Sequence, residues 1–187
     1  TGQYRRSVAA AEMLTTKLDS SEALQTCGML HLQAATAAGA LGDHDTSATH
    51  LAEASALAAR MDTEVGTWAN LWFGPTSVGF YRTSLALELG EHGQAVQAAT
   101  KVHPELLPNR RQVEFWAKVG RALLAKKKTR HKGVQVLLHA EQLAPQRIRT
   151  DVFVRETVAG LLRQARRDAG GRELRNLAWR LGIAPIW

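Results

Sequence analysis

The sequence predicts an all-α fold, an α-solenoid of about four antiparallel helix pairs that forms a single domain over residues 1–187. The chain is rich in alanine and leucine and has few runs of β-branched residues, which favours helix. Apolar residues recur at helical spacing, and no useful stretch alternates as a strand would. Similar segments recur at intervals of 41 residues, with Ala58, Ala99 and Ala140 at the same place in each. A period near 40 residues with two helices per unit is typical of a solenoid.

Turn and capping signals divide the chain into successive helices. Residues 19–22, Asp-Ser-Ser-Glu, combine a break with a capping signal, and the glycines at 42 and 90 mark turns. Prolines end later helices because proline has no N–H and cannot continue the hydrogen-bond ladder. The expected helices span residues 3–18, 22–40, 46–61, 76–89, about 95–102, 110–125, 133–143, 151–167 and 171–181.

The stretch 68–90 carries five of the eleven aromatic residues of the chain. We expect the pair Gly74-Pro75 to break the backbone, and Thr76 or Ser77 to cap the helix that follows. Trp68 and Trp72 are four residues apart, so on a helix they would share one face. Large rigid side chains beside a helix start suit the wall of a binding pocket, although they equally suit a helix–helix core.

A stacked array of helix pairs makes a concave groove lined by the first helix of each pair. Such a groove suits an extended peptide or a partly apolar small molecule. Aromatic side chains would supply apolar contact there, and Arg82 would pair with a ligand carboxylate. The candidate ligand-binding residues are Trp68, Trp72, Phe73, Thr76, Tyr81, Arg82, Phe115 and Trp116.

Charge is distributed unevenly along the chain. Residues 1–100 contain 5 Lys and Arg against 10 Asp and Glu, whereas residues 101–187 contain 19 against 7. Such asymmetry suits an acidic ligand, nucleic acid, or contact between opposite halves of two subunits, so we expect a homodimer. The densest basic run lies in a turn between helices, where it either holds phosphates or is a solvated loop. Its candidate nucleic-acid contacts are Lys126, Lys127, Lys128, Arg130 and Lys132.

The remaining motifs argue against an enzyme, a metal centre and a membrane protein. The nearest His and Asp cluster, at 43–45 with His50, lacks metal-ligand spacing and is better explained as a solvated turn. Cys27 has only His31, one helical turn on, as a partner for nucleophilic chemistry. No apolar run approaches the roughly 20 residues of a membrane span. We expect no catalytic activity, cofactor or metal, and a single cysteine fits a reducing cytoplasm.

Three segments carry a resemblance to a known family. They are LGDHDTSATHLAEASALAA at 41–59, WFGPTSVGFYRTSLALELG at 72–90 and AEQLAPQRIRTDVFVRE at 140–156. Over about residues 20–182 the chain resembles the tetratricopeptide-repeat part of actinobacterial Xre-type transcriptional regulators, which also carry an N-terminal helix-turn-helix domain. Ser77 and Tyr81 stand where that family usually has Asn and His. No helix-turn-helix segment is recognisable here, so DNA contact is expected through a domain outside this sequence.

The resemblance implies a sensory and oligomerisation domain of a cytoplasmic transcriptional regulator with a peptide or small-molecule effector. The alternative is a protein–protein interaction scaffold without a small ligand, and a third possibility is direct binding of nucleic acid by the basic half. These hypotheses differ in what the structure should contain. A sensor of a small molecule needs an enclosed aromatic pocket, whereas a scaffold needs an open groove. Nucleic-acid binding should weaken steeply with salt.

Overall fold

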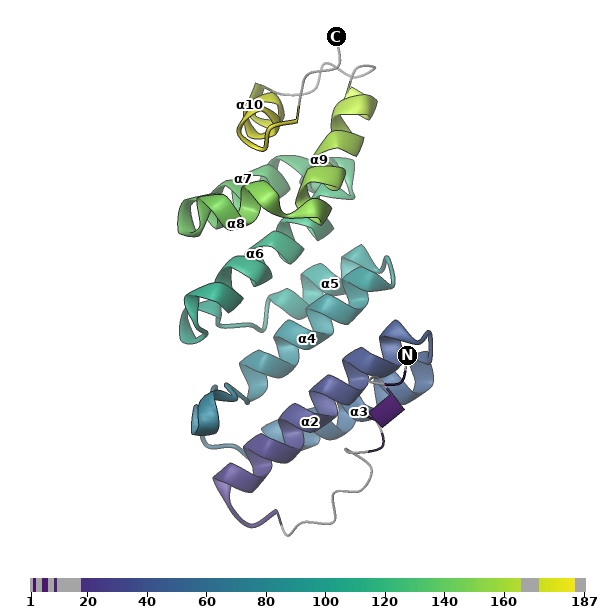
Figure 1. Ribbon diagram of the computed structural model, residues 1–187, viewed down its shortest axis with the longest axis vertical. Helices are drawn as coiled ribbons and strands as arrows, with labels where there is room; N and C mark the ends of the chain where they lie inside the picture. Colours follow the sequence, from purple (N-terminus) through teal and green to yellow (C-terminus); the bar gives the residue numbers. More distant parts are fainter. Residues whose placement is uncertain (1, 3–4, 7–8, 10–17, 166–171, 184–187) are drawn as a thin grey trace. The chain divides into compact units, whose positions relative to one another are not determined.

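The computed structural model describes residues 2, 5–6, 9, 18–165 and 172–183. Most of these residues are helical, and they form no β-strand (Figure 1). The all-α prediction is therefore confirmed. The helix expected over residues 3–18 lies almost entirely outside the described residues.

The chain divides into two compact units, Thr1–Leu107 and Pro108–Trp187, which we treat separately. The described elements of the first unit are α2 (Ser21–Ala40), α3 (His44–Ala58), the 3₁₀ turn η1 (Trp68–Asn70), α4 (Pro75–Glu88), α5 (His92–Ala99) and the 3₁₀ turn η2 (Pro104–Leu106). Those of the second are α6 (Asn109–Leu124), the 3₁₀ turn η3 (Lys127–Thr129), α7 (Arg130–Leu143), α8 (Pro145–Thr150), α9 (Val152–Ala165) and α10 (Arg172–Arg180).

Two helix pairs build the first unit. Helix α2 packs on α3 and α4 packs on α5, and α4 also contacts both helices of the pair before it. The cap at Ser20 matches the sequence signal, since its Oγ accepts from Ala23 N at 3.2 Å. Helix α3 begins at His44, two residues earlier than expected, because Asp43 Oδ1 caps it by accepting from Thr46 N at 3.1 Å. Ser47, buried between α2 and α3, donates to the carbonyl of Ala35 at 2.7 Å. Small and hydroxyl side chains thus let the helices of a pair approach closely.

The core of the first unit centres on Phe73. Its side chain is 0% exposed and lies against Gly28 on α2, where a Cβ atom would overlap the aromatic ring. The surrounding core includes Leu24, Leu32 and Leu57. Phe73 therefore fills a notch that only glycine leaves open.

The segment before Phe73 is not the helix that the aromatic spacing suggested. Residues 69, 70 and 72 have positive φ values of 48°, 58° and 57°, and only a 3₁₀ turn forms there. Gly66 N donates to Phe73 O at 2.7 Å and Phe73 N to Gly66 O at 3.0 Å, which closes the segment into a loop. The prediction that Trp68 and Trp72 share a helical face is therefore wrong, because this loop is too tight for a continuous α-helix.

The break at Gly74-Pro75 is confirmed, but the predicted caps are not. Helix α4 starts at Pro75, one position earlier than expected, because proline suits the first helical position. Thr76 and Ser77 are consequently inside the helix. The Thr76 hydroxyl donates to Glu64 Oε2 at 3.2 Å and accepts from His103 N at 3.3 Å, and the Ser77 hydroxyl donates to the Trp72 carbonyl.

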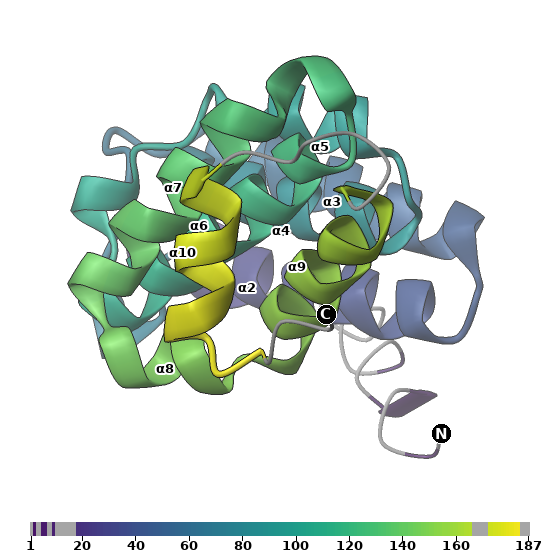
Figure 2. The same cartoon turned by 90° about the horizontal axis from the view of Figure 1, so that it is seen from above.

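In the second unit α6 packs on α7, and α10 contacts both α7 and α9 (Figure 2). Its core has the aliphatic side chains of Leu124, Leu137, Val154 and Leu177 at its centre. Helix α8 was not predicted. It is six residues long and begins at the proline that ends α7, so a stop signal for one helix is also the first residue of another.

A buried carboxylate ties three helices of this unit together. Glu141 on α7 is 6% exposed and accepts from Arg149 Nε on α8 at 3.0 Å and from Arg180 Nε on α10 at 2.8 Å. A carboxylate that bonds two guanidinium groups is stabilising only while both partners remain.

We expect Gly28→Ala to destabilise the protein by about 1–3 kcal/mol, because the added methyl overlaps the Phe73 ring. Replacing glycine by alanine in a helix interior ordinarily stabilises a protein by up to about 1 kcal/mol, so the expected effect here has the opposite sign. Urea unfolding followed by circular dichroism measures it. Gly160→Ala is the control, because the nearest atom to its new Cβ lies at 3.8 Å. Equal effects from the two substitutions would contradict this packing.

We expect Glu141→Gln to cost about 1–3 kcal/mol of unfolding free energy, because the amide removes the charge and turns an N–H group toward one arginine. Glu114→Gln is the matched control. It breaks a more exposed pair with Lys118 at 2.8 Å, which should contribute about 0.5 kcal/mol or less. Urea unfolding measures the stability of both variants. A smaller loss of unfolding free energy for Glu141→Gln than for Glu114→Gln would contradict a stabilising role of the Glu141 carboxylate.

Candidate functional site

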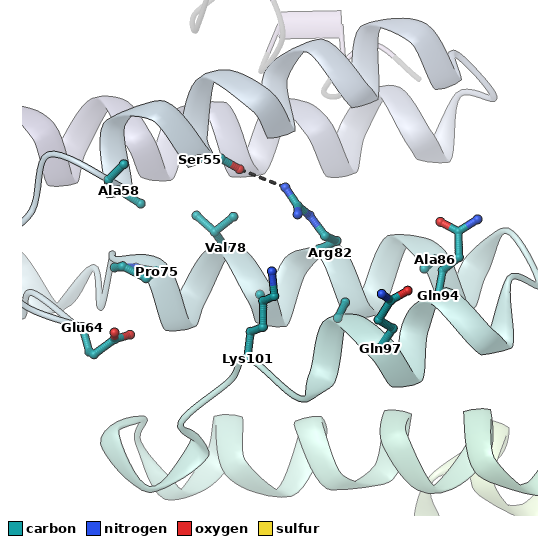
Figure 3. A pocket seen from close by; sticks show the side chains of 13 residues that line it. Ser55, Ala58, Glu64, Pro75, Val78, Arg82, Ala86, Gln94, Gln97 and Lys101 are labelled. Carbon is teal, nitrogen blue, oxygen red and sulfur yellow. Dashed lines mark hydrogen bonds between the residues drawn. The ribbon is translucent and has the colours of Figure 1, made fainter.

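The first unit contains a groove that follows helix α4 (Figure 3). It consists of two adjoining hollows of about 660 and 560 Å³, both lined by Arg82, Ala86 and Gln94. Helix α3 forms one wall, α4 the middle and α5 the other wall. We call this feature the α4 groove.

Small side chains line much of the α4 groove. Ala58, Ala86 and Val78 are buried, and Gly79 faces residues 98–102 so closely that a Cβ there would lie 2.8 Å from Val102 Cγ2. Alanine and glycine at these positions bring the helices together while leaving a shallow hollow above them. Small residues thus form the base of the groove, and one of them, Ala58, belongs to the set that recurs at intervals of 41 residues.

Polar side chains rise from the edges of the same groove. Gln94, Gln97 and Lys101 are exposed and line it from the α5 side. Arg82 extends from α4 toward α3 and donates from Nη2 to Ser55 Oγ at 3.1 Å (Figure 3). A guanidinium has five N–H donors, so this single bond to a described residue leaves others for a carboxylate or carbonyl.

Of the residues predicted to bind a ligand, Arg82 lines the α4 groove. Phe73 and Thr76 are each 0% exposed and serve packing and hydrogen bonding instead. Trp68 is 46% exposed and its backbone N–H donates to Gln25 Oε1 at 2.9 Å, which holds the loop on α2.

The other predicted aromatics lie elsewhere, and neither hollow is lined by Phe, Tyr or Trp. Trp72 is half-buried in the loop before α4. The Tyr81 hydroxyl accepts from Gln33 Nε2 at 2.8 Å, so it links α4 to α2. Phe115 and Trp116 belong to the second unit, where their rings meet edge to face at 5.0 Å.

The groove residues that were not predicted include five polar ones of the larger hollow, Gln94, Gln97, Lys101, Ser55 and Glu64. A signal for three of them was present, because Gln94, Gln97 and Lys101 recur at spacings of three and four. Such spacing places polar side chains on one helical face. The face of α5 that they occupy is known only once α4 is placed beside it.

The basic turn is a surface feature of the second unit. Lys126, Lys127, Lys128 and Lys132 are exposed, and Arg130 is half-buried at the start of α7. These side chains offer positive charge at the surface, which fits contact with phosphates.

A histidine pair joins α2 to α3. His31 Nδ1 and the Nδ1 of buried His50 lie 2.9 Å apart, so one ring donates and the other accepts. Burial lowers the pKa of His31, and the positive charge that His50 can carry lowers it further, whereas Glu53 raises it. The contact needs at least one neutral imidazole, because protonating both rings would remove the acceptor.

The described residues contain no group of three or more His, Cys, Asp and Glu side chains that could hold a metal ion. Among those same residues there is also no helix with the length and apolar character needed to cross a membrane. Comparison with protein-family models, curated proteins and solved structures finds no match for this chain.

We expect stability to fall as pH drops from 7.5 to 5.5. The His31 pKa in the folded state lies below the ordinary histidine value of 6.5, so the unfolded chain takes up a proton first as pH falls through that value. His31→Gln should reduce the pH dependence of stability. His44→Gln, at an exposed position, should leave that dependence unchanged. Thermal unfolding of the three proteins at several pH values is the measurement. A native curve that is flat across this range would contradict the assignment.

Proposed function

We propose that this chain is the sensory and oligomerisation part of a cytoplasmic transcriptional regulator, and that it binds an extended peptide in the α4 groove. The observation that carries the proposal is the groove itself, with a base of small side chains and exposed polar groups along its edges. Gln94 and Gln97 each offer a donor and an acceptor for a peptide main chain. Arg82 and Lys101 offer charge for an acidic side chain or terminus.

The proposed architecture is a tetratricopeptide-like solenoid. Three pairs joined by short connections, α2 with α3, α4 with α5 and α6 with α7, support it. Within each unit the neighbouring pair stacks on the one before, since α4 contacts α2 and α3, while α9 contacts α6 and α10 contacts α7. Contact between sequential neighbours is the defining property of repeat arrays.

An extended ligand fits the groove better than a compact one. Helix α4 has 14 residues and is therefore about 20 Å long. That length matches about six residues of extended chain. Compact ligands are usually enclosed on most sides by apolar walls, whereas this groove is open and several of its lining residues are exposed.

The alternative is a protein–protein interaction scaffold, which the open groove suits equally well. The two proposals differ in output rather than in the groove. In the regulator, occupancy changes how a helix-turn-helix domain outside this sequence engages DNA, and the acidic and basic halves favour a homodimer. In the scaffold, binding of the partner is itself the function.

Groove binding is tested with a phage-displayed library of random hexapeptides selected on the native chain. We expect selected peptides to bind, and Ala59→Trp to weaken them roughly tenfold or more, because the indole occupies the groove that Ala59 lines. Ala40→Trp is the control, since Ala40 is exposed at the end of α2 and outside both hollows. Fluorescence polarisation measures the affinities. Failure to select any peptide, or equal binding by the two variants, would overturn the proposal.

A further inference from the structure

Charged side chains of the α4 groove are separated by sign along its length. One hollow is lined by Lys101 and Arg82, together with Glu64 at its far end. The adjoining hollow, which shares Arg82, is lined by Glu88 and Glu91. Between Glu64 and the end of α4, an occupant of the groove therefore meets two cations and then two carboxylates.

The basic part is arranged to hold a carboxylate. Lys101 is exposed and extends from the segment after α5, while Arg82 reaches across the same hollow (Figure 3). Glu64 forms an ion pair with neither of them, and its Oε2 accepts the Thr76 hydroxyl at 3.2 Å near the start of α4. An approaching carboxylate can thus meet Arg82 and Lys101 together.

The acidic part is arranged to hold a cation. Glu88, the last residue of α4, and Glu91, which precedes α5, are both exposed. The Glu91 side chain makes no capping hydrogen bond to α5. Two carboxylates that face one hollow repel each other, and a bound cation would relieve that repulsion. His44 also lines this hollow.

The helix supplies the distance between the two parts. Lys101 lies beside Gly79, since a Cβ on Gly79 would be 3.8 Å from the Lys101 carbonyl oxygen. From Gly79 to Glu88 the helix rises about 14 Å. An extended chain covers that distance in about four residues, and residues four apart lie on the same side of such a chain.

We propose that the natural occupant of the α4 groove is an extended peptide segment with one acidic and one basic side chain about four residues apart. Its carboxylate binds Arg82 and Lys101, and its cation binds Glu88 and Glu91. The inference rests on the proposed peptide-binding function and adds the charge pattern that selects the peptide. Matching charges of both signs discriminates among peptides of equal net charge.

Two acetylated and amidated heptapeptides test the charge spacing. Both are made of serine and valine with one lysine and one glutamate, placed four positions apart in the first and adjacent in the second. Their composition and net charge are identical, so a difference in affinity reports the spacing. With the full chain we expect the affinity for the spaced probe to be at least about three times that for the adjacent one. Titrations monitored by the amide NMR shifts of the protein measure both affinities.

Charge reversals test each end of the groove separately. Lys101→Glu should weaken the spaced probe about threefold or more, whereas Lys132→Glu, an exposed change of equal charge on the second unit, should not. Glu91→Lys should have the same effect at the other end, with exposed Glu156→Lys as its control. A probe with lysine in place of its glutamate should bind Lys101→Glu better than the native chain, which shows direct pairing.

The outcomes separate the charge pattern from the groove. Equal affinity for the two heptapeptides, with both lost in Ala59→Trp, would overturn the charge pattern and leave groove binding intact. Reversals at 101 and 91 that match their controls would overturn it as well. Absence of binding by both heptapeptides, when selected hexapeptides do bind, would also overturn it. Absence of binding by every peptide would overturn both proposals.

Discussion

The contact on which the first unit depends is that of Phe73 with Gly28. The ring occupies the place of a side chain on α2, and it fixes the residue immediately before Gly74-Pro75. Helix α4 therefore begins at a defined position relative to α2. Because α4 forms the middle of the groove, this contact also sets where Arg82 reaches α3 and where the small residues face the walls.

Polar contacts around the same loop reinforce this position. Gln25 on α2 accepts the backbone N–H of Trp68, and the Thr76 hydroxyl connects Glu64 with the backbone of His103. The loop is thus tied both to the helix before it and to the segment after α5. In the second unit a single carboxylate, Glu141, has the comparable role, since its two arginines come from different helices. Each unit combines helices that pack closely through small side chains with a few specific hydrogen bonds or ion pairs between elements.

Much of the fold followed from local patterns in the chain. The helical periodicity, the cap at Ser20 and the break at Gly74-Pro75 depend on residues near one another in sequence. The residues of the candidate site were predicted less well from the sequence. Aromatic content pointed to the stretch 68–73 as a pocket wall, but Phe73 is core and the loop has an irregular backbone. Arg82 was predicted to bind a ligand, and it lines the groove.

By itself the sequence determined the all-helical class, most of the helices and the unequal charge of the two halves, because these depend on spacing, caps and composition. Only the tertiary structure decided which faces meet. Three features bring together residues from different helices. They are the notch at Gly28, the buried carboxylate of Glu141 and the groove that both Arg82 and Gln94 line. The physical reason is that periodicity places a side chain on a helix face but does not specify its neighbour. That choice is made by the fit of small and large side chains between helices.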